Sequence, residues 1–269
     1  MDNTNIQLLT LNVRGLKRNK KRKCILNWLK KTMCPDIIFL QETYIDKEID
    51  QKLSKEWSGQ HFHSYSSSNH SAGVSILFKP KLDLRIVGHF SSQDGRKLLL
   101  NAILNGQKLS LVNLYAPNDV QRRIEFFKNA QRWIKYHSDT DTHVIIGGDL
   151  NSIDCHRDRA SGNISSCAKH LSSFKTALDV IDIWRDQHPN QNEYTYIDPT
   201  NPQKGSRIDY ILTSSGLSKS VKKTYITNAP VPDHKAVVVT LREDTGTRGK
   251  GYWKINNSII GVSRLSVRN

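Results

Sequence analysis

The sequence predicts an α/β fold, and three observations point to it. Short apolar runs that are typical of buried strands alternate with amphipathic segments that repeat at helical spacing. Gly, Pro, Asn and Ser are frequent between these segments, as in turns and loops. The 269 residues are enough for one large domain or two small ones with a sizeable core. We therefore expect buried strands covered by amphipathic helices.

The first half of the chain is predicted to contain one helix and five strands. The helix spans about residues 17–34 and has a basic start, because six of the seven residues in 17–23 are Lys or Arg. Asn105-Gly106 lies between two apolar runs and is a strong hairpin signal. The expected strands are 6–13, 36–40, 72–78, 97–104 and 108–114.

Residues 58–71 are rich in Ser and His and are expected to form a loop. His61, His63 and His70 have no ligand-like partners nearby in the sequence, so we expect them at the surface. The four cysteines are scattered without Cys-x-x-Cys spacing, which makes a zinc site or a disulfide framework unlikely to arise from them.

The second half begins with a helix whose apolar face includes residues 124–134. A short strand, residues 144–147, follows and is predicted to be central, and another amphipathic helix is expected over 171–181. The composition shifts to Gly, Thr and Lys after Arg242. We therefore expect a domain over 1–242 and a flexible linker or tail over 243–269. The remaining expected strands are 207–212, 221–227 and 236–241.

The net charge indicates the kind of partner. Forty Lys and Arg against 25 Asp and Glu give +15, with a pI near 9.7. This favours a polyanionic partner, a nucleic acid above all, over a neutral small substrate, although solvated surface lysines are an alternative. No apolar run approaches the length of a membrane span, and no signal segment starts the chain, so we expect an intracellular protein that does not bind membranes.

The residues after the central strand are the first candidates for a site. If the backbone stays extended, Asp149 and Asn151 lie two apart and on the same side. An Asx turn that closes the strand is the alternative interpretation, since both residue types favour turns.

Other predicted strands also end in polar residues. They deliver Asn12, Glu42, Asn118 beside Tyr115, and Asp233-His234, while Asp209 is expected within a strand. Each has an ordinary explanation: Glu42 as a surface charge, Asp209 as the partner of Arg207, His234 as a turn residue. Their repeated occurrence at strand ends is what favours a shared site.

This set suits phosphoryl transfer to water. Glu42 is a natural ligand for Mg²⁺, and Asn12 would orient it or bind the ion too. Asp149 would position and deprotonate the attacking water, which Asn151 would hold. Asp209 would favour the protonated form of His234, which would bind phosphate. Tyr115 would donate to the same oxygens or to the leaving group.

Six motifs occur in a fixed order and carry a resemblance to a known family. They are Leu11-Asn12-Val13-Arg14-Gly15, Gln41-Glu42-Thr43, Asn113-Leu114-Tyr115-Ala116-Pro117-Asn118, Gly148-Asp149-Leu150-Asn151, Arg207-Ile208-Asp209-Tyr210 and Asp233-His234. Over residues 5–242 the chain resembles the endonuclease/exonuclease/phosphatase superfamily, and most closely the apurinic-like endonuclease domain of LINE-type retrotransposons. The resemblance implies a four-layer α/β sandwich, two packed mixed β-sheets flanked by helices.

The resemblance also implies roles for single residues. Asn12 and Glu42 map to a metal site for Mg²⁺, or Mn²⁺ in its place. The catalytic positions are Asp149, Asn151, Tyr115, Asp209, Asp233 and His234. The positions that resemble phosphate or DNA contacts are Asn118, Thr195 and Arg159.

By this resemblance we expect an endonuclease that acts in the nucleus, nicks one strand of duplex DNA and leaves a 3′-hydroxyl that primes reverse transcription. Residues 251–258 resemble the linker that precedes a reverse transcriptase domain in the same polyprotein. Alternatives are a repair-type apurinic/apyrimidinic endonuclease, a phosphatase of inositol phosphates or lipids, and a decayed copy that binds DNA without cleaving it. Pro232, where the family usually has Ser, motivates the last alternative.

Overall fold

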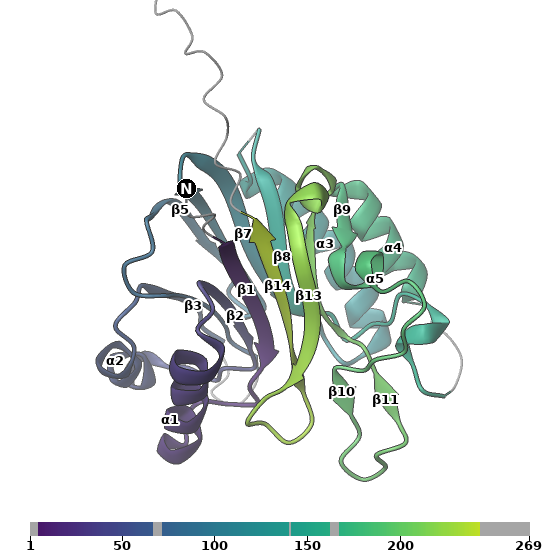
Figure 1. Cartoon of the computed structure of the whole chain (residues 1–269), viewed down its shortest axis with the longest axis horizontal. Coiled ribbons are helices and arrows are strands. Elements are labelled where there is room, and N and C mark those ends of the chain that lie inside the picture. Colours follow the sequence, from purple (N-terminus) through teal and green to yellow (C-terminus); the bar gives the residue numbers. More distant parts are fainter. Residues whose placement is uncertain (1–4, 67–71, 140, 162–166, 243–269) are drawn as a thin grey trace, which may run out of the picture.

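Two six-stranded β-sheets lie face to face between outer layers of helices (Figure 1). The structure is a computed structural model, and it describes residues 5–66, 72–139, 141–161 and 167–242. The expected boundary at 242 and the tail over 243–269 lie outside the described residues. Within the described residues, no helix is both long and apolar enough to cross a membrane.

The first sheet has the strand order β13-β14-β1-β2-β4-β3. Only the pair β1 and β2 is parallel, because the chain crosses over between them through a helix. Its strands are β1 (Asn5–Asn12), β2 (Ile37–Gln41), β3 (His61–Ser64), β4 (Val74–Phe78), β13 (Val221–Asn228) and β14 (Lys235–Arg242).

The second sheet has the order β5-β6-β7-β8-β12-β9. Here β7 and β8 are the parallel pair, joined by a long helix. Its strands are β5 (Leu84–Ser91), β6 (Lys97–Leu104), β7 (Gln107–Tyr115), β8 (His143–Asp149), β9 (Val180–Asp182) and β12 (Asp209–Ser214). A separate two-stranded ribbon pairs β10 (Tyr196–Ile197) with β11 (Gly205–Ser206).

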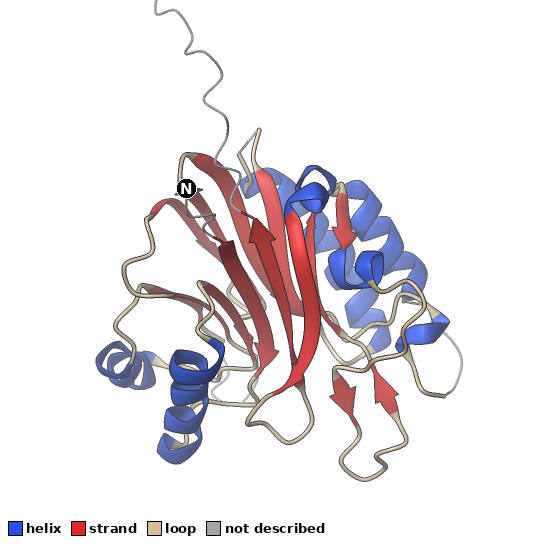
Figure 2. Ribbon diagram, viewed as in Figure 1, coloured by secondary structure: helices blue, strands red, loops and turns tan. Residues whose placement is uncertain are grey.

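Three apolar cores separate four layers, which confirms the α/β sandwich. The central core joins the facing surfaces of the sheets and includes Phe39 and Val237 of the first sheet and Ile211 of the second. A second core packs α1 and α2 onto the first sheet, and a third packs α3 and α4 onto the second (Figure 2). The helices are α1 (Asn19–Trp28), α2 (Lys47–Glu56), α3 (Val120–His137), α4 (Ala168–Ala177) and α5 (Ile183–Gln187).

Local sequence explains several element ends. Asp46 and Asp119 cap α2 and α3, each accepting from a backbone N–H three residues on. Asn105 and Gly106 both have positive φ, as a two-residue hairpin requires, so this prediction is confirmed. α1 passes into a π-helical turn, Leu29–Met33, which ends in left-handed Cys34.

Four expectations need correction. The segment 58–71 is not all loop, because β3 lies within it as the edge strand of the first sheet. His63 is consequently buried and His61 is half-buried, so neither is the surface residue that we expected. His70 lies outside the described residues. The helix expected over 171–181 ends at Ala177, where the chain turns into the strand that contains Ile181.

The fourth correction concerns the strand expected over 207–212, which begins at Asp209 and runs to Ser214 as β12. Several elements were not predicted at all, namely α2, α5, β5, β9 and β11. The basic and acidic residues of α2 dilute its apolar stripe to Ile49 and Leu53. β5 is buried mainly through alternate residues, a weak signal in a short strand.

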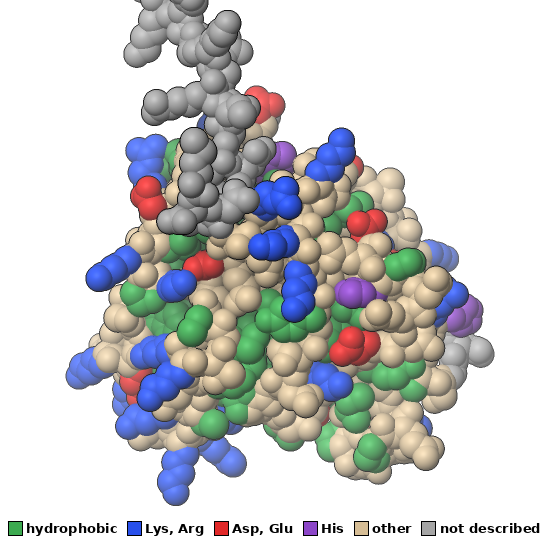
Figure 3. All heavy atoms as spheres, in the orientation of Figure 1, with side chains coloured by type: hydrophobic (Ala, Val, Ile, Leu, Met, Phe, Trp, Pro, Cys, Tyr) green, Lys and Arg blue, Asp and Glu red, His purple; other side chains and the backbone are tan. Residues whose placement is uncertain are grey.

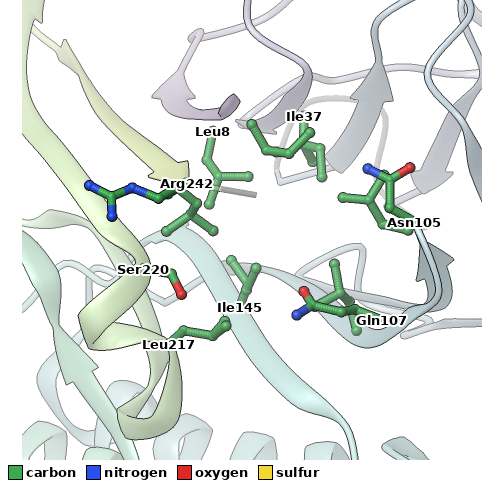
Figure 4. Close-up of a pocket in the computed structure, with 12 residues that line it drawn as sticks. Leu8, Ile37, Asn105, Gln107, Ile145, Leu217, Ser220 and Arg242 are labelled. Carbon is green, nitrogen blue, oxygen red and sulfur yellow. The ribbon is translucent and has the colours of Figure 1, made fainter. Parts of the chain in front are cut away.

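The central core contains a small cavity of about 40 Å³ between the sheets (Figure 4). Its lining includes Leu8, Ile37, Ile145 and Leu217, with Arg242 at one side. These residues lie toward the opposite end of the strands from Asp149. A cavity lined mainly by aliphatic side chains has few groups for acid–base chemistry, so it is not a candidate catalytic site.

Candidate active site

The carboxyl ends of the two parallel strand pairs lie at the same edge of the sandwich, the lower edge in Figure 1. Asn12 ends β1 and Glu42 directly follows β2. In the other sheet Tyr115 ends β7, and its Cα partner in the register is Asp149 at the end of β8. Parallel strands bring their carboxyl ends together, so these side chains meet where the two sheets face each other.

Asn12 connects the two sheets at this edge. It is fully buried, and its Nδ2 donates to Glu42 Oε1 and to Asp149 Oδ2, both at 2.9 Å. Its Oδ1 accepts from the backbone N–H of Arg14 at 3.0 Å. One amide thus fixes the spacing between a carboxylate of each sheet.

Glu42 is held by hydroxyl groups as well. Tyr115 Oη donates to its Oε1 at 2.7 Å and Tyr44 Oη donates to its Oε2 at 2.6 Å. Burial alone would raise the pKa of Glu42, but the hydrogen bonds from Asn12, Tyr44 and Tyr115 lower it below its ordinary value. Burial raises the pKa of both tyrosines, and their contacts with Glu42 raise it further. Glu42 is therefore an ionised carboxylate beside neutral phenols.

Asp149 is buried and faces a second carboxylate. Its Cα partner across β8 and β12 is Asp209, which is also fully buried. Burial raises the pKa of Asp149, and the charge of Asp209 raises it further, to about 7. Such a carboxyl takes up and releases a proton near neutral pH, which suits a general base.

His234 contacts Asp209 through Nδ1, at 3.0 and 3.2 Å from the two carboxylate oxygens. Burial lowers the pKa of His234, but the charges of Asp209, Asp149 and Asp233 outweigh burial and raise it to about 9. The imidazole is then a cation at neutral pH, with Nδ1–H on Asp209 and Nε2–H left as a second donor.

This geometry rejects all three of the ordinary explanations. Arg207 does not pair with Asp209; it pairs with Asp158 and Asp182 instead. His234 is buried rather than a plain turn residue. The explanation of Glu42 as a surface charge also fails, because three side chains hold it in place.

Asn151 does not lie on an extended continuation of β8. Its φ is +47°, and its backbone N–H donates to Asp149 Oδ1 at 3.0 Å, so the Asx turn is present. The turn nevertheless brings Asn151 beside the site, where its Nδ2 donates to the carbonyl of Ala116. The extended interpretation is therefore wrong and the Asx turn is correct; the turn is what positions the amide.

Asp233 precedes His234 and is buried too. Arg14 Nη1 lies 2.5 Å from its Oδ2 and forms an ion pair across the loop that follows β1. The carbonyl of Asp233 accepts from the backbone N–H of Ile197 on β10. Pro232, next to it, is exposed.

Comparison with known proteins agrees with this geometry. Residues 9–245 match the Endonuclease/Exonuclease/phosphatase family. The chain belongs to this family. The resemblance drawn from the ordered motifs is therefore confirmed, and the chain is classed with metal-dependent hydrolases of phosphate esters.

A relative is the Transposon TX1 uncharacterized 149 kDa protein of Xenopus laevis, which is 28% identical over 257 residues. The match covers 95% of this chain but only 19% of the relative. Among solved structures, the AP endonuclease LMAP from Leishmania major matches with a TM-score of 0.75 and 18% identity, over 88% of each chain. An AP endonuclease from Archaeoglobus fulgidus gives 0.70 and 20%, over 88% of this chain and 99% of that one. The structural matches establish the fold.

Within this family fold, the three predicted DNA or phosphate contacts occupy different places. Thr195 is fully buried, and its Oγ1 accepts from the backbone N–H of Ile208 and of Asp209, at 3.0 and 3.1 Å. It supports the start of β12 in this arrangement. Arg159 is half-buried, bridges to Ser206 on β11 and lines a surface pocket of about 330 Å³.

Asn118 is exposed in the turn before α3. Its backbone carbonyl accepts from Arg123, and the turn places it outside the hydrogen-bonded network around Glu42. Contact of Asn118, Thr195 and Arg159 with DNA stays a prediction.

Sequence reasoning did not single out several residues that complete the site. Tyr44 holds Glu42, and Arg96 lies over the ring of Tyr115 at 4.7 Å. Beneath the site, Gln41 donates to Asn113 at 2.7 Å and ties the two sheets together. Both Gln41 and Asn113 lie in the ordered motifs, which was the available signal; Tyr44 and Arg96 have none.

The residues present fit a divalent cation. Glu42 supplies an ionised oxygen donor, and Asn12 carries an amide oxygen at the same edge. Asp149, Asp209 and His234 also offer ligand atoms that all lie within 4.8 Å of one another. The mutual repulsion that raises the pKa of Asp149 is a second sign, since a cation nearby would relieve it.

Proposed function

We propose that this chain is a Mg²⁺-dependent DNA endonuclease that nicks one strand of duplex DNA and leaves a 3′-hydroxyl. The observation that carries the proposal is the buried group of Asp149, Asp209 and His234 beside Glu42 at one edge of the sandwich. Glu42 and Asn12 would hold the ion, which would supply positive charge to a phosphate oxygen and to the leaving oxygen.

Asp149 acts as the base in this proposal. Its carboxylate accepts a proton from the attacking water, whose oxygen bonds to phosphorus. The bond from phosphorus to the 3′ oxygen breaks and the departing oxygen takes a proton from solvent water, so that the products are a 5′-phosphate and a 3′-hydroxyl. Asn151 donates through Nδ2 to Ala116, which leaves its Oδ1 to orient the water.

His234 stabilises the charge that develops on the phosphate. Asp209 accepts from Nδ1, so the Nε2–H of the imidazolium donates to a nonbridging oxygen. Tyr115 donates to Glu42, and in this position it orients the carboxylate. Arg14 holds Asp233 and thereby the loop that presents His234.

The surface charge supports a polyanionic substrate. The chain carries +15, and Lys and Arg side chains are visible over the region of α1 (Figure 3). On and beside this helix, exposed cations include Arg18, Lys20, Lys23 and Lys30. We expect binding to duplex DNA that weakens steeply with salt, because each phosphate contact releases counterions.

The test is conversion of supercoiled plasmid to open circles with Mg²⁺ or Mn²⁺. EDTA, Glu42→Ala and His234→Ala should each abolish nicking, while His143→Ala, at the far end of β8, is the matched control. Extension of the nick by a DNA polymerase without prior end repair would show the 3′-hydroxyl. Nicking by the Glu42 and His234 variants at the parent rate would refute the proposal.

We further propose that the nick primes reverse transcription in the nucleus, by a reverse transcriptase domain in the same longer polypeptide. The support is the transposon relative, of which this chain spans about a fifth. A fusion of the endonuclease to its natural downstream segment, incubated with template RNA and plasmid, should yield cDNA joined to the nick. Unlinked cDNA would contradict this part alone.

A repair-type endonuclease is the second candidate, because two solved structures that share this fold are AP endonucleases. A duplex with one abasic site, compared with the same intact duplex, separates the two. Strong preference for the abasic duplex would favour repair. If the plasmid is bound but not nicked, the decayed copy is favoured, and Pro232→Ser is the variant to try next.

A further inference from the structure

A second cluster of metal-ligating side chains lies away from the catalytic edge. Asp50 on α2 faces His61 and His63, which alternate on the edge strand β3. The ligand atoms of all three lie within 4.8 Å of one another. We propose that these residues form a binding site for a zinc ion that clips α2 to β3.

The distances match tetrahedral zinc. Asp50 Oδ1 is 3.3 Å from His61 Nε2 and 3.1 Å from His63 Nε2. Two ligand atoms that are each about 2.1 Å from a zinc ion, at the tetrahedral angle, are separated by roughly 3.4 Å. Both imidazoles thus present the same nitrogen toward one carboxylate oxygen.

Two of these ligand atoms are buried without a hydrogen-bond partner. The side chain of His63 is only 3% exposed, and neither its Nε2 nor Asp50 Oδ1 has a hydrogen-bond partner of acceptable geometry. Buried polar atoms without a hydrogen-bond partner destabilise a fold, and one ion bound to both atoms would give each of them a partner. His61 Nε2 lies 3.1 Å from Ser54 Oγ, the contact that an ion would displace.

The surrounding groups orient the three ligands. His63 Nδ1 is 2.6 Å from Ser75 Oγ, and His61 Nδ1 is 3.2 Å from the carbonyl of Gly59. Tyr65 Oη donates to Asp50 Oδ2 at 2.8 Å. Partners on the far side of metal-binding imidazoles and carboxylates fix tautomer and direction, and here each ligand has one.

Zinc is the ion that this set favours. Two imidazoles and one carboxylate are ligands that zinc binds, whereas Mg²⁺ prefers oxygen alone. The three side chains supply three ligands, and a water molecule would complete the fourth position. The site goes beyond the proposed nuclease function and does not depend on it.

The test uses the full chain, freed of metal and kept in excess Mg²⁺ so that the catalytic edge is not available to zinc. Zinc bound per chain after gel filtration, competition with a chromogenic chelator, and the visible spectrum of added Co²⁺ report the site. The ligand variants are His61→Ala and Asp50→Asn, both at partly exposed positions. His89→Ala, next to β3, and His234→Ala, at the catalytic edge, are the matched controls.

We expect one zinc per chain in the parent and both controls, with a tetrahedral Co²⁺ spectrum. Zinc at about 100 times its Kd should raise the parent Tm by roughly 5 °C or more. His61→Ala and Asp50→Asn should bind at least tenfold more weakly and lose this rise, and Tyr65→Phe should weaken binding about tenfold.

The proposal is overturned if the chain binds no zinc, or if His61→Ala and Asp50→Asn bind as tightly as the parent. Loss of zinc in His234→Ala alone would place the ion at the catalytic edge and overturn it as well. Circular dichroism of each variant confirms folding before zinc is added. None of these measurements uses cleavage of DNA.

Discussion

Two groups of buried charged residues lie near the start of β12, one around Arg207 and the other around Asp209. They differ in the balance between cations and anions. Arg207 donates to Asp158 at 2.8 Å and to Asp182 at 2.6 Å, and Arg185 also pairs with Asp158. Two cations thus meet two anions. The pKa of Asp158 is low, since the guanidinium groups outweigh the effect of burial.

The neighbouring group is unbalanced. The charges of Asp209, Asp149 and Asp233 all act on one buried imidazole, that of His234. The pKa of Asp149 is raised to about 7 in this group. A balanced buried cluster holds a fold together, whereas an unbalanced one keeps groups ready to move protons or to bind a cation.

The largest expected effect is on catalysis. Asp149→Asn should lower kcat for nicking by about 10³-fold, since general-base catalysis contributes roughly 10²–10⁴-fold. The same change should leave the free energy of unfolding unchanged or slightly higher, because it removes a repelling charge. Plasmid nicking and urea unfolding measure the two. A variant that loses stability by several kcal/mol would contradict the comparison.

Arg207→Met should act in the opposite way. It leaves Asp158 and Asp182 without their main buried cation, which typically costs about 3–5 kcal/mol of unfolding free energy. Urea unfolding measures the loss, with exposed Lys222→Met as the control, expected within about 0.5 kcal/mol. Unchanged stability would show that the cluster is not structural.

Thr195→Val tests the support of β12. Its hydroxyl accepts from two backbone N–H groups, and removing it leaves buried donors unpaired, at about 1–3 kcal/mol. We expect the fold to survive and kcat to fall more than KM rises, because Asp209 shifts. Thr195→Ser should restore both. Equal activity in Thr195→Val would instead reopen a direct role in DNA contact.

The smallest effect is on pH dependence. Asp209 raises the pKa of His234 to about 9, so activity should fall by about tenfold per pH unit above that value, as the imidazolium loses its proton. The stability that this charge contributes is complete below pH 6.5 and is lost as pH rises through about 9. Asp209→Asn should shift this fall in activity to lower pH. If activity falls at the same pH in Asp209→Asn as in the parent, Asp209 does not set the pKa of His234.

Local sequence patterns determined much of the fold. The short run before Asp149 could only be a buried strand, and the paired Asn105 and Gly106 supply the two positive φ values of a hairpin. The polar residues at several predicted strand ends favoured one shared site. These inferences need only neighbours along the chain, so one sequence was sufficient for them.

The tertiary structure alone decided which charges meet. Asn12 and Asp149 are 137 residues apart, and nothing local distinguishes Asp209 as the partner of His234 from Asp209 as the partner of Arg207. Likewise, the sequence predicted His63 at the surface, whereas in the structure it is buried on an edge strand beside Asp50. Packing of two sheets and their helices sets such contacts, and packing depends on residues far apart in sequence.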